Sequence, residues 1–127
     1  YLQQEKSDGY FYTVRYELTN NLLMRMRSGF TAHSEEQATS LAYKADLLLL
    51  DDIGAEKPSE WVEQELYGLI EDRYRNGKLL VVATNEVEPT IKAKLGERIT
   101  SRLFDSETGK VKQVYLTAPD YRTGVQA

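Results

Sequence analysis

Polar side chains directly follow two apolar runs of the sequence, and their types could handle a metal ion and a phosphate. Asp51 and Asp52 follow a run of leucines, and Thr84 and Asn85 follow the run at 79–83. One carboxylate can hold Mg²⁺ through its waters, and a second can orient or deprotonate an attacking water. An amide can hold that water or a phosphate oxygen. Each pair also has a plainer interpretation, an acidic turn capped by Asp52 and a Thr-Asn turn.

A third segment supplies positive charge. Arg98 and Arg102 are four residues apart in a predicted helix and therefore share a helix face. Two guanidinium groups on one face could grip phosphate oxygens. The alternative is a structural salt bridge from this pair to the acidic middle of the chain, where Glu71 and Asp72 are candidate partners.

Alternating apolar runs and amphipathic stretches predict the elements that position these side chains. Strands are predicted over 10–16, 47–50, 79–83 and 111–117. Helices are predicted over 17–28, 34–44, 59–76, 89–95 and 97–104. This alternation indicates the α/β class, a parallel sheet flanked by helices. The polar residues after neighbouring parallel strands would then share the sheet edge at which such folds bind ligands.

Composition excludes several classes of protein. A length of 127 residues fits one domain, and 41% hydrophobic residues exclude a disordered tail. With 0 cysteines and 1 histidine, a disulfide framework, a cysteine nucleophile and the common zinc sites are excluded. The net charge of −4 disfavours a generally basic nucleic-acid binder. No run of about 18 apolar residues exists, so we expect no membrane-spanning segment and no membrane partner. The lack of cysteines permits a reducing compartment, and the expected location is the cytoplasm.

In combination, the three segments resemble the ATPase core of AAA+ proteins, a family of P-loop NTPases. The resemblance rests on LLLLDDIG at 47–54, VVATN at 81–85 and GERITSRLF at 96–104. It resembles the DnaC and DnaI type of helicase loader in particular, because DDIGAEKPSEWV at 51–62 is similar to that branch and less so to transposition-helper ATPases. The resemblance covers nearly the whole chain, so residues 1–127 are expected to be the C-terminal part of a single AAA+ domain.

The resemblance implies a role for each polar residue. Asp51 matches the Walker B aspartate that holds Mg²⁺, and Asp52 stands where many AAA+ proteins have the catalytic glutamate. Asn85 matches sensor 1, and Thr84 beside it is expected in the nucleotide site. An aspartate at 52 is one methylene shorter than the usual glutamate, which puts its reach to the water in question.

The resemblance also implies roles for three arginines. Arg102 matches the arginine finger, which reaches the ATP of a neighbouring subunit, and Arg98 lies in the same motif as a nucleotide-binding residue. Arg122 resembles the sensor 2 arginine. The implied ligands are ATP and Mg²⁺, and the implied mode of assembly is self-association through Arg102.

One element of the family is missing from the sequence. No glycine-rich loop of the form G-x-x-x-x-G-K-[ST] occurs in the 127 residues. In the family this loop precedes the segment that resembles Tyr1–Lys6, which is expected to be the end of the helix after the loop. The family sheet has the order 5-1-4-3-2, so we expect an incomplete core that lacks central strand 1, through truncation or degeneration. The isolated chain is expected to be inactive.

The function that follows from the resemblance is ATP-dependent loading of a replicative DNA helicase, with the helicase and single-stranded DNA as partners. A transposition-helper ATPase is an alternative within the family. A non-enzymatic interaction module is an alternative of another class. In that case the Asp and Arg pairs form structural salt bridges, and a partner binds helix 59–76.

Overall fold

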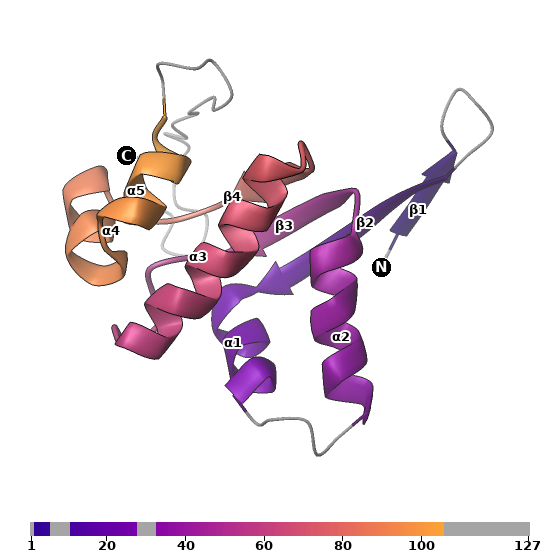
Figure 1. The fold of residues 1–127 in the computed structure, drawn as a ribbon, viewed down its shortest axis with the longest axis horizontal. Helices are drawn as coiled ribbons and strands as arrows, with labels where there is room; N and C mark the ends of the chain where they lie inside the picture. Colours follow the sequence, from indigo (N-terminus) through magenta and orange to yellow (C-terminus); the bar gives the residue numbers. More distant parts are fainter. Residues whose placement is uncertain (1, 6–10, 28–32, 106–127) are drawn as a thin grey trace, which may run out of the picture.

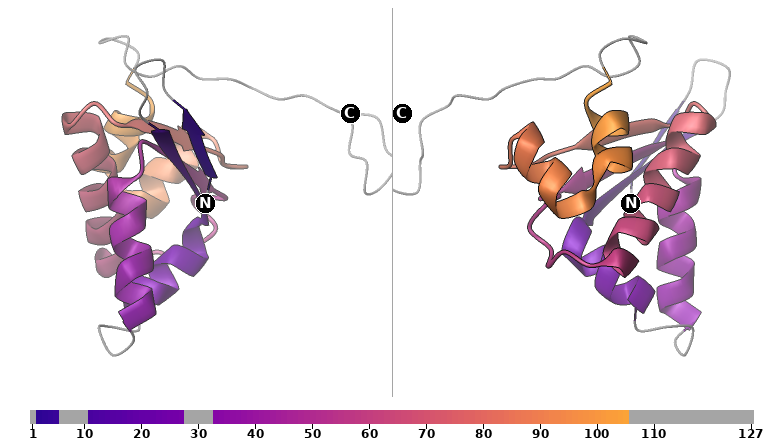
Figure 2. Two further views of the ribbon diagram at one scale, coloured as in Figure 1. Left: turned by 90° about the vertical axis from the view of Figure 1, so that its right-hand side faces the viewer. Right: turned by 60° about the vertical axis from the view of Figure 1, so that its left-hand side comes forward.

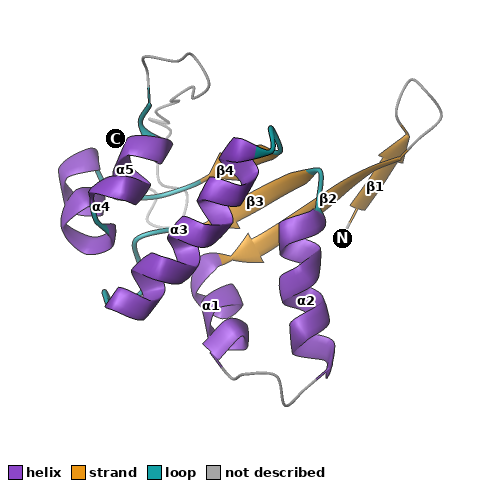
Figure 3. Cartoon of the chain, in the orientation of Figure 1, coloured by secondary structure: helices purple, strands orange, loops and turns teal. Residues whose placement is uncertain are grey.

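The computed structural model of the chain describes residues 2–5, 11–27 and 33–105. Its strands are β1 (Leu2–Glu5), β2 (Phe11–Leu18), β3 (Leu47–Asp51) and β4 (Leu79–Val82). Its helices are α1 (Thr19–Arg27), α2 (His33–Lys44), α3 (Glu60–Arg75), α4 (Glu88–Leu95) and α5 (Glu97–Leu103) (Figure 1 and Figure 3). The predicted strand at 111–117 and Arg122 lie outside the described residues. Among the described helices, none has the length and apolar character to cross a membrane.

The four described strands form one sheet in the order β1-β2-β3-β4. Strands β2, β3 and β4 are parallel, with Tyr16, Leu49 and Val81 in register across them. This confirms the predicted α/β class with a parallel sheet. The run β4-β3-β2 is also the order that the resemblance implies for strands 4, 3 and 2. In that order strand 1 would lie beside β4, which is the last strand at this edge of the described sheet.

The expectation of a helix end at Tyr1–Lys6 is wrong. Residues Leu2–Glu5 form a strand that pairs antiparallel with β2, with Leu2 opposite Val14 and Glu5 opposite Phe11. So short a segment gains little from helical hydrogen bonds, because the first turn is costly to nucleate. The unpaired edge of β2 instead offers its backbone groups a ready set of partners.

The hydrophobic core lies between one face of the sheet and the helices. Leu48 and Leu50 of β3 are buried and pack with residues of α1, α2 and α3, which are Leu22, Ala42 and Leu69. A second cluster joins α3 to α4 and α5 through Leu66, Ile70, Ile91, Leu95 and Ile99. Figure 2 shows α2 and α3 together on one side of the sheet. The alternation of side chains along β3 therefore determines which face is covered.

The opposite face of the sheet is apolar and open within the described residues. Tyr16, Leu79 and Val81 are 58%, 60% and 49% exposed, respectively. They belong to the face that points away from Leu48 and Leu50, since side chains alternate along each strand. A shallow hollow on this face is lined by Tyr16, Leu49, Leu50, Asp51, Val81 and Ala83. The hollow opens beside the first of the predicted site residues.

Helix α3 begins and ends where the sequence predicts. The side-chain oxygen of Ser59 accepts a hydrogen bond from the backbone N–H of Val62, at 3.1 Å, and so caps the first turn. Asn76 forms the C-terminal cap. The next residue, Gly77, has a φ of 65°, a conformation that glycine adopts without strain.

A fully buried arginine ties this helix to the sheet. Arg73 donates to backbone carbonyls where α2 leads into β3 and at the start of β4. Its acceptors are Ala42, Tyr43, Ala45, Asp46 and Leu79. Burial lowers the pKa of Arg73. The side chain thus satisfies several carbonyls that would otherwise be buried without a donor.

Candidate functional site

The polar residues that follow β3 and β4 converge at the carboxyl edge of the sheet, as predicted. The backbone N–H of Ala83 donates to the carbonyl of Leu50, and the N–H of Ile53 donates to the carbonyl of Ala83, at 2.9 and 3.0 Å. These bonds extend the β3–β4 pairing past the strand ends. They bring the segment with Asp51 next to the segment with Thr84.

Asp51 accepts hydrogen bonds from two residues, one in β2 and one at the start of α1. The Tyr16 hydroxyl donates to its carboxylate at 2.5 Å, and the Thr19 hydroxyl donates to its backbone carbonyl at 2.8 Å. The hydrogen bond to Asp51 raises the pKa of Tyr16, and the charges of Asp51 and Asp52 add to that effect. Tyr16 was not identified from the sequence as a site residue. Only the β2–β3 register, which pairs Tyr16 with Leu49, places it on the same face as Asp51.

Asp52 has the backbone conformation of a turn residue and a side chain open to solvent. Its φ is 58°, in the left-handed region that aspartate tolerates better than most residues. Its carbonyl accepts from the N–H of Ala55 at 3.4 Å. The acidic turn is therefore present, but the Asp52 side chain makes no hydrogen bond or ion pair with the rest of the described chain. An exposed carboxylate of this kind can still bind a water.

Thr84 and Asn85 differ in how much of their side chain is engaged. The Thr84 hydroxyl donates to the carbonyl of Ile53 at 2.7 Å and accepts from the N–H of Glu86 at 3.0 Å. It therefore links the two loops after β3 and β4. Asn85 is exposed beside it, and its amide has no hydrogen-bond partner among the described residues. Of the two, Asn85 has the side chain that is open to a ligand.

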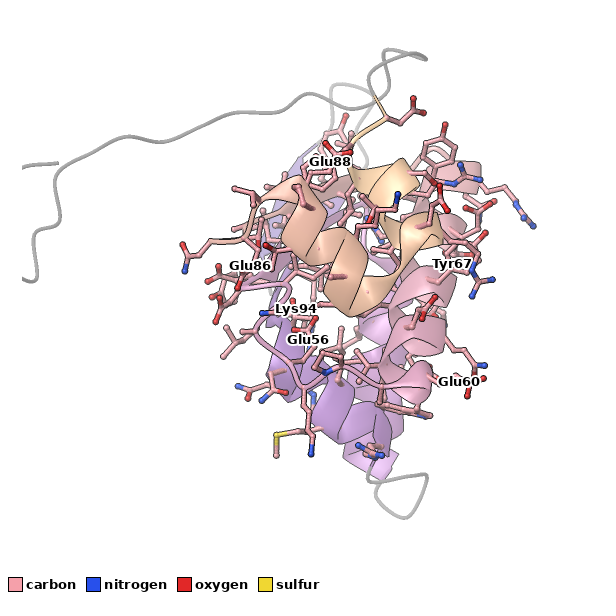
Figure 4. The ribbon with its side chains drawn as sticks, turned by 90° about the vertical axis from the view of Figure 1, so that its left-hand side faces the viewer. Glu56, Glu60, Tyr67, Glu86, Glu88 and Lys94 are labelled. Carbon is pink, nitrogen blue, oxygen red and sulfur yellow. The ribbon has the colours of Figure 1, made fainter. Side chains whose placement is uncertain are left out.

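Lys94 of α4 makes a second link between these loops, which the sequence did not predict. Its ammonium group donates to the carbonyl of Gly54 at 2.9 Å and to Glu86 at 3.0 Å. In Figure 4 Lys94 reaches from α4 toward Glu86, with Glu56 nearby. Glu56 is buried, and one of its oxygens accepts from the N–H of Gly54 at 3.0 Å. Helix α4 thus holds both strand-end loops in place.

Gly54 is required where the loop meets this helix. Its φ is 93°, and a Cβ at this position would lie 2.9 Å from the terminal methyl of Ile91 and 3.2 Å from Glu86. Any side chain here would strain the backbone and push the loop from α4. The Asp-Asp-Ile-Gly segment therefore needs its glycine for close packing.

Arg98 and Arg102 lie on α5 next to α3, and the described structure gives neither a hydrogen bond to the strand-end loops. The Arg102 Nε donates to Glu71 at 2.6 Å, and its guanidinium lies 4.6 Å from the ring centroid of Tyr74. Arg98 lies 4.1 Å from the ring centroid of Tyr67. The salt bridge that the sequence offered as an alternative role for Arg102 is present, with Glu71 as the partner. The bond with Arg102 lowers the pKa of Glu71 and raises that of Arg102.

The site fits Mg²⁺ only if ligands from outside the described residues complete the coordination of the ion. No three histidine, aspartate or glutamate side chains gather into a metal cage anywhere in the described ranges. Mg²⁺ usually keeps several waters and takes one or two carboxylates together with phosphate oxygens. In a site of that kind Asp51 and Asp52 would be the carboxylates, and a nucleotide would supply the phosphates.

Solved structures of replication proteins share this fold. A DnaC helicase loader superposes with a TM-score of 0.60 at 23% identity, over 72% of this chain and 56% of that one. A replication initiator DnaA bound to AMPPCP and single-stranded DNA superposes with a TM-score of 0.62 at 21% identity, over 75% and 29%. AMPPCP-bound DnaA from Aquifex aeolicus gives 0.58 at 21%, over 72% and 28%.

These matches confirm the fold that the sequence resemblance implied. The chain spans about half the length of the DnaC structure and less than a third of the DnaA structures. No family model and no curated protein sequence matches the chain significantly.

Proposed function

We propose that the chain is the part of an ATPase of DNA replication that senses and hydrolyses ATP, and that the complete protein loads a replicative helicase in the cytoplasm. The observation that carries the proposal is the convergence of Asp51, Asp52 and Asn85 at the carboxyl edge of parallel strands. This is where open α/β sheets bind their ligands. The fold shared with a helicase loader and with AMPPCP-bound initiators supports it.

In the proposed site each residue has its own task. Asp51 holds Mg²⁺ through water, with its carboxylate oriented by Tyr16. The ion would neutralise phosphate charge. Asp52 orients the attacking water, and Asn85 binds that water or a γ-phosphate oxygen. The same proposal assigns Arg102 to the nucleotide of a neighbouring subunit, and it includes single-stranded DNA as a partner of the complete protein.

A mixing experiment tests the shared site. Asp51→Asn and Arg102→Ala variants of the complete protein are each expected to lose ATPase activity. When they are mixed, an Arg102→Ala subunit keeps its Asp51 and can receive Arg102 from an Asp51→Asn neighbour. Activity should therefore return in part. Co-assembly without any return of activity, or full activity of Arg102→Ala alone, would contradict the trans role.

The reading frame upstream of Tyr1 provides an independent test. A phosphate-binding loop ending in Gly-Lys-Ser or Gly-Lys-Thr is expected within about 50 residues, since its backbone N–H groups would cradle the nucleotide phosphates. If no such loop is encoded, the ATPase proposal fails for this protein.

One observation favours a second candidate, the non-enzymatic interaction module. The ion pair between Arg102 and Glu71 is formed within a single chain. If the protein is such a module, the role of this ion pair is to hold α5 against α3. Arg102→Ala should then lower the stability of the complete protein, and neither the variant nor the wild type should show ATPase activity. Measuring both quantities on the same variant separates the two candidates.

A further inference from the structure

The two arginines of α5 are in different electrostatic states. Arg102 is paired with Glu71, and the Arg102 side chain is 32% exposed while that of Glu71 is 15% exposed. The guanidinium also lies against the ring of Tyr74. Within the chain, the charge of Arg102 is therefore already balanced by Glu71, and the Nε–H of Arg102 already donates a hydrogen bond.

Arg98 is exposed and has no carboxylate partner in the described part of the chain. It lies over the ring of Tyr67, at 4.1 Å from the centroid. Stacking on an aromatic face orients a guanidinium and leaves the N–H groups at its edge free to donate. Arg98 is thus a preoriented cation that faces solvent.

Helix periodicity arranges these groups as one surface. Tyr67, Glu71 and Tyr74 follow a spacing of four and three residues and so lie on one face of α3. Arg98 and Arg102 lie one turn apart on α5, each against one of these tyrosines. Figure 4 looks onto α4 and α5, with Tyr67 labelled on the adjoining α3. The result is two stacked arginines with Glu71 between the two tyrosines that support them. Glu71 also pairs with the exposed Arg75 at 3.3 Å, and the Tyr74 hydroxyl donates to Asp105 at 3.0 Å.

We propose that this α3–α5 face binds the polyphosphate chain of a nucleotide, that Arg98 makes the first contact, and that Glu71 is an internal competitor that withholds Arg102 until phosphate displaces it. The choice of a nucleotide rests on the proposed function. A polyphosphate carries more charge than one carboxylate and can accept from both guanidinium groups at once. Phosphate binding and the release of Arg102 from Glu71 are therefore coupled.

The test uses the 127-residue chain with inorganic tripolyphosphate at low ionic strength, followed by the NMR signals of the arginine Nε–H groups. Arg98→Ala should weaken binding about tenfold, the loss of a charge-assisted contact. Arg102→Ala should weaken binding less than Arg98→Ala does, because phosphate gains the Arg102 contact only by breaking the bond between Arg102 and Glu71. Glu71→Gln should tighten binding severalfold, because no carboxylate then has to be displaced, and the Arg102 signal should respond at lower tripolyphosphate concentrations than in the wild type. Lys92→Ala, an exposed base on α4, is the matched control.

Three results would overturn the proposal. The first is wild-type affinity in Arg98→Ala, and the second is no gain of affinity in Glu71→Gln. The third is tighter binding of a single-stranded oligodeoxynucleotide than of tripolyphosphate through the same arginines. The ligand of the α3–α5 face would then be a nucleic-acid backbone. Failure here is distinct from failure of the proposed function, because the mixing experiment measures ATPase activity of the complete protein.

Discussion

The hydroxyl of Tyr16 donates a hydrogen bond to the carboxylate of Asp51, with 2.5 Å between the two oxygens. The two residues are 35 positions apart in the sequence and come from adjacent parallel strands. The bond orients the carboxylate that we propose as the metal-holding group. It also makes Tyr16 a reporter of the charge at this edge of the sheet.

The first prediction concerns the pKa of Tyr16. Asp51 raises it by accepting the phenolic proton's hydrogen bond and by its negative charge. Asp51→Asn should therefore bring the pKa of Tyr16 down toward its ordinary value, as measured from the pH dependence of the ring carbon next to the hydroxyl in NMR spectra. Asp52→Asn is the control and should act more weakly, because Asp52 contributes only its more distant charge. Equal shifts in the two variants would contradict the hydrogen bond.

The second prediction separates the two aspartates by function. In the complete protein, Asp51→Asn should abolish hydrolysis and weaken binding of ATP with Mg²⁺, because the metal loses its carboxylate. Asp52→Asn should retain ATP binding and slow hydrolysis, since only the orientation of the water is lost. Filter binding and single-turnover hydrolysis measure the two steps. A normal hydrolysis rate in Asp52→Asn would leave Asp52 as a turn residue only.

The third prediction is that the 127-residue chain alone binds ATP weakly or not at all. Asp51, Asp52 and Asn85 would contact mainly the metal and the γ-phosphate, and the sequence has no glycine-rich cradle for the other phosphates. Titration with a fluorescent ATP analogue and Mg²⁺ measures the affinity. Binding in the micromolar range would refute this expectation.

The fourth prediction follows from the lowered pKa of Glu71. A carboxylate whose pKa is lower in the folded state stabilises the fold above its ordinary value of 4.5, and this stabilisation disappears as the pH falls through the lowered pKa. Glu71→Gln should therefore lower the free energy of unfolding at neutral pH, as measured by thermal denaturation. The loss should be about 1 kcal/mol or less, because the pair is partly solvated. The difference from wild type should vanish in acid. Glu60→Gln, at the exposed start of α3 and outside the ion pairs of the described residues, is the comparison variant.

The fifth prediction concerns Arg73. Arg73→Leu should lower the free energy of unfolding by about 3 kcal/mol or more, because several buried carbonyls lose their donor. Arg75→Leu, with a side chain that is 75% exposed, should change it by less than about 0.5 kcal/mol. Urea unfolding followed by circular dichroism compares the two. Similar losses in both variants would show that the carbonyl contacts of Arg73 contribute little.

Local patterns in the sequence were sufficient for most elements and for the position of the candidate site. The helix predicted over 59–76, for example, is α3, which spans Glu60–Arg75 between its caps Ser59 and Asn76. The site edge was also predictable, because polar residues that follow two neighbouring parallel strands must come out at the same edge. That logic places Asp51 and Asn85 at one edge of the sheet from the sequence alone.

Only the tertiary structure determined the contacts between residues that are far apart in the chain. The pairing of β1 with β2 and the bond from Tyr16 to Asp51 depend on strand register. The pairing of Arg102 with Glu71 depends on how α5 packs against α3. A shift of one residue in the β2–β3 register would turn Tyr16 to the other face of the sheet. Such relationships leave no local periodicity, because their geometry is set by the packing of separate elements rather than by spacing along the chain.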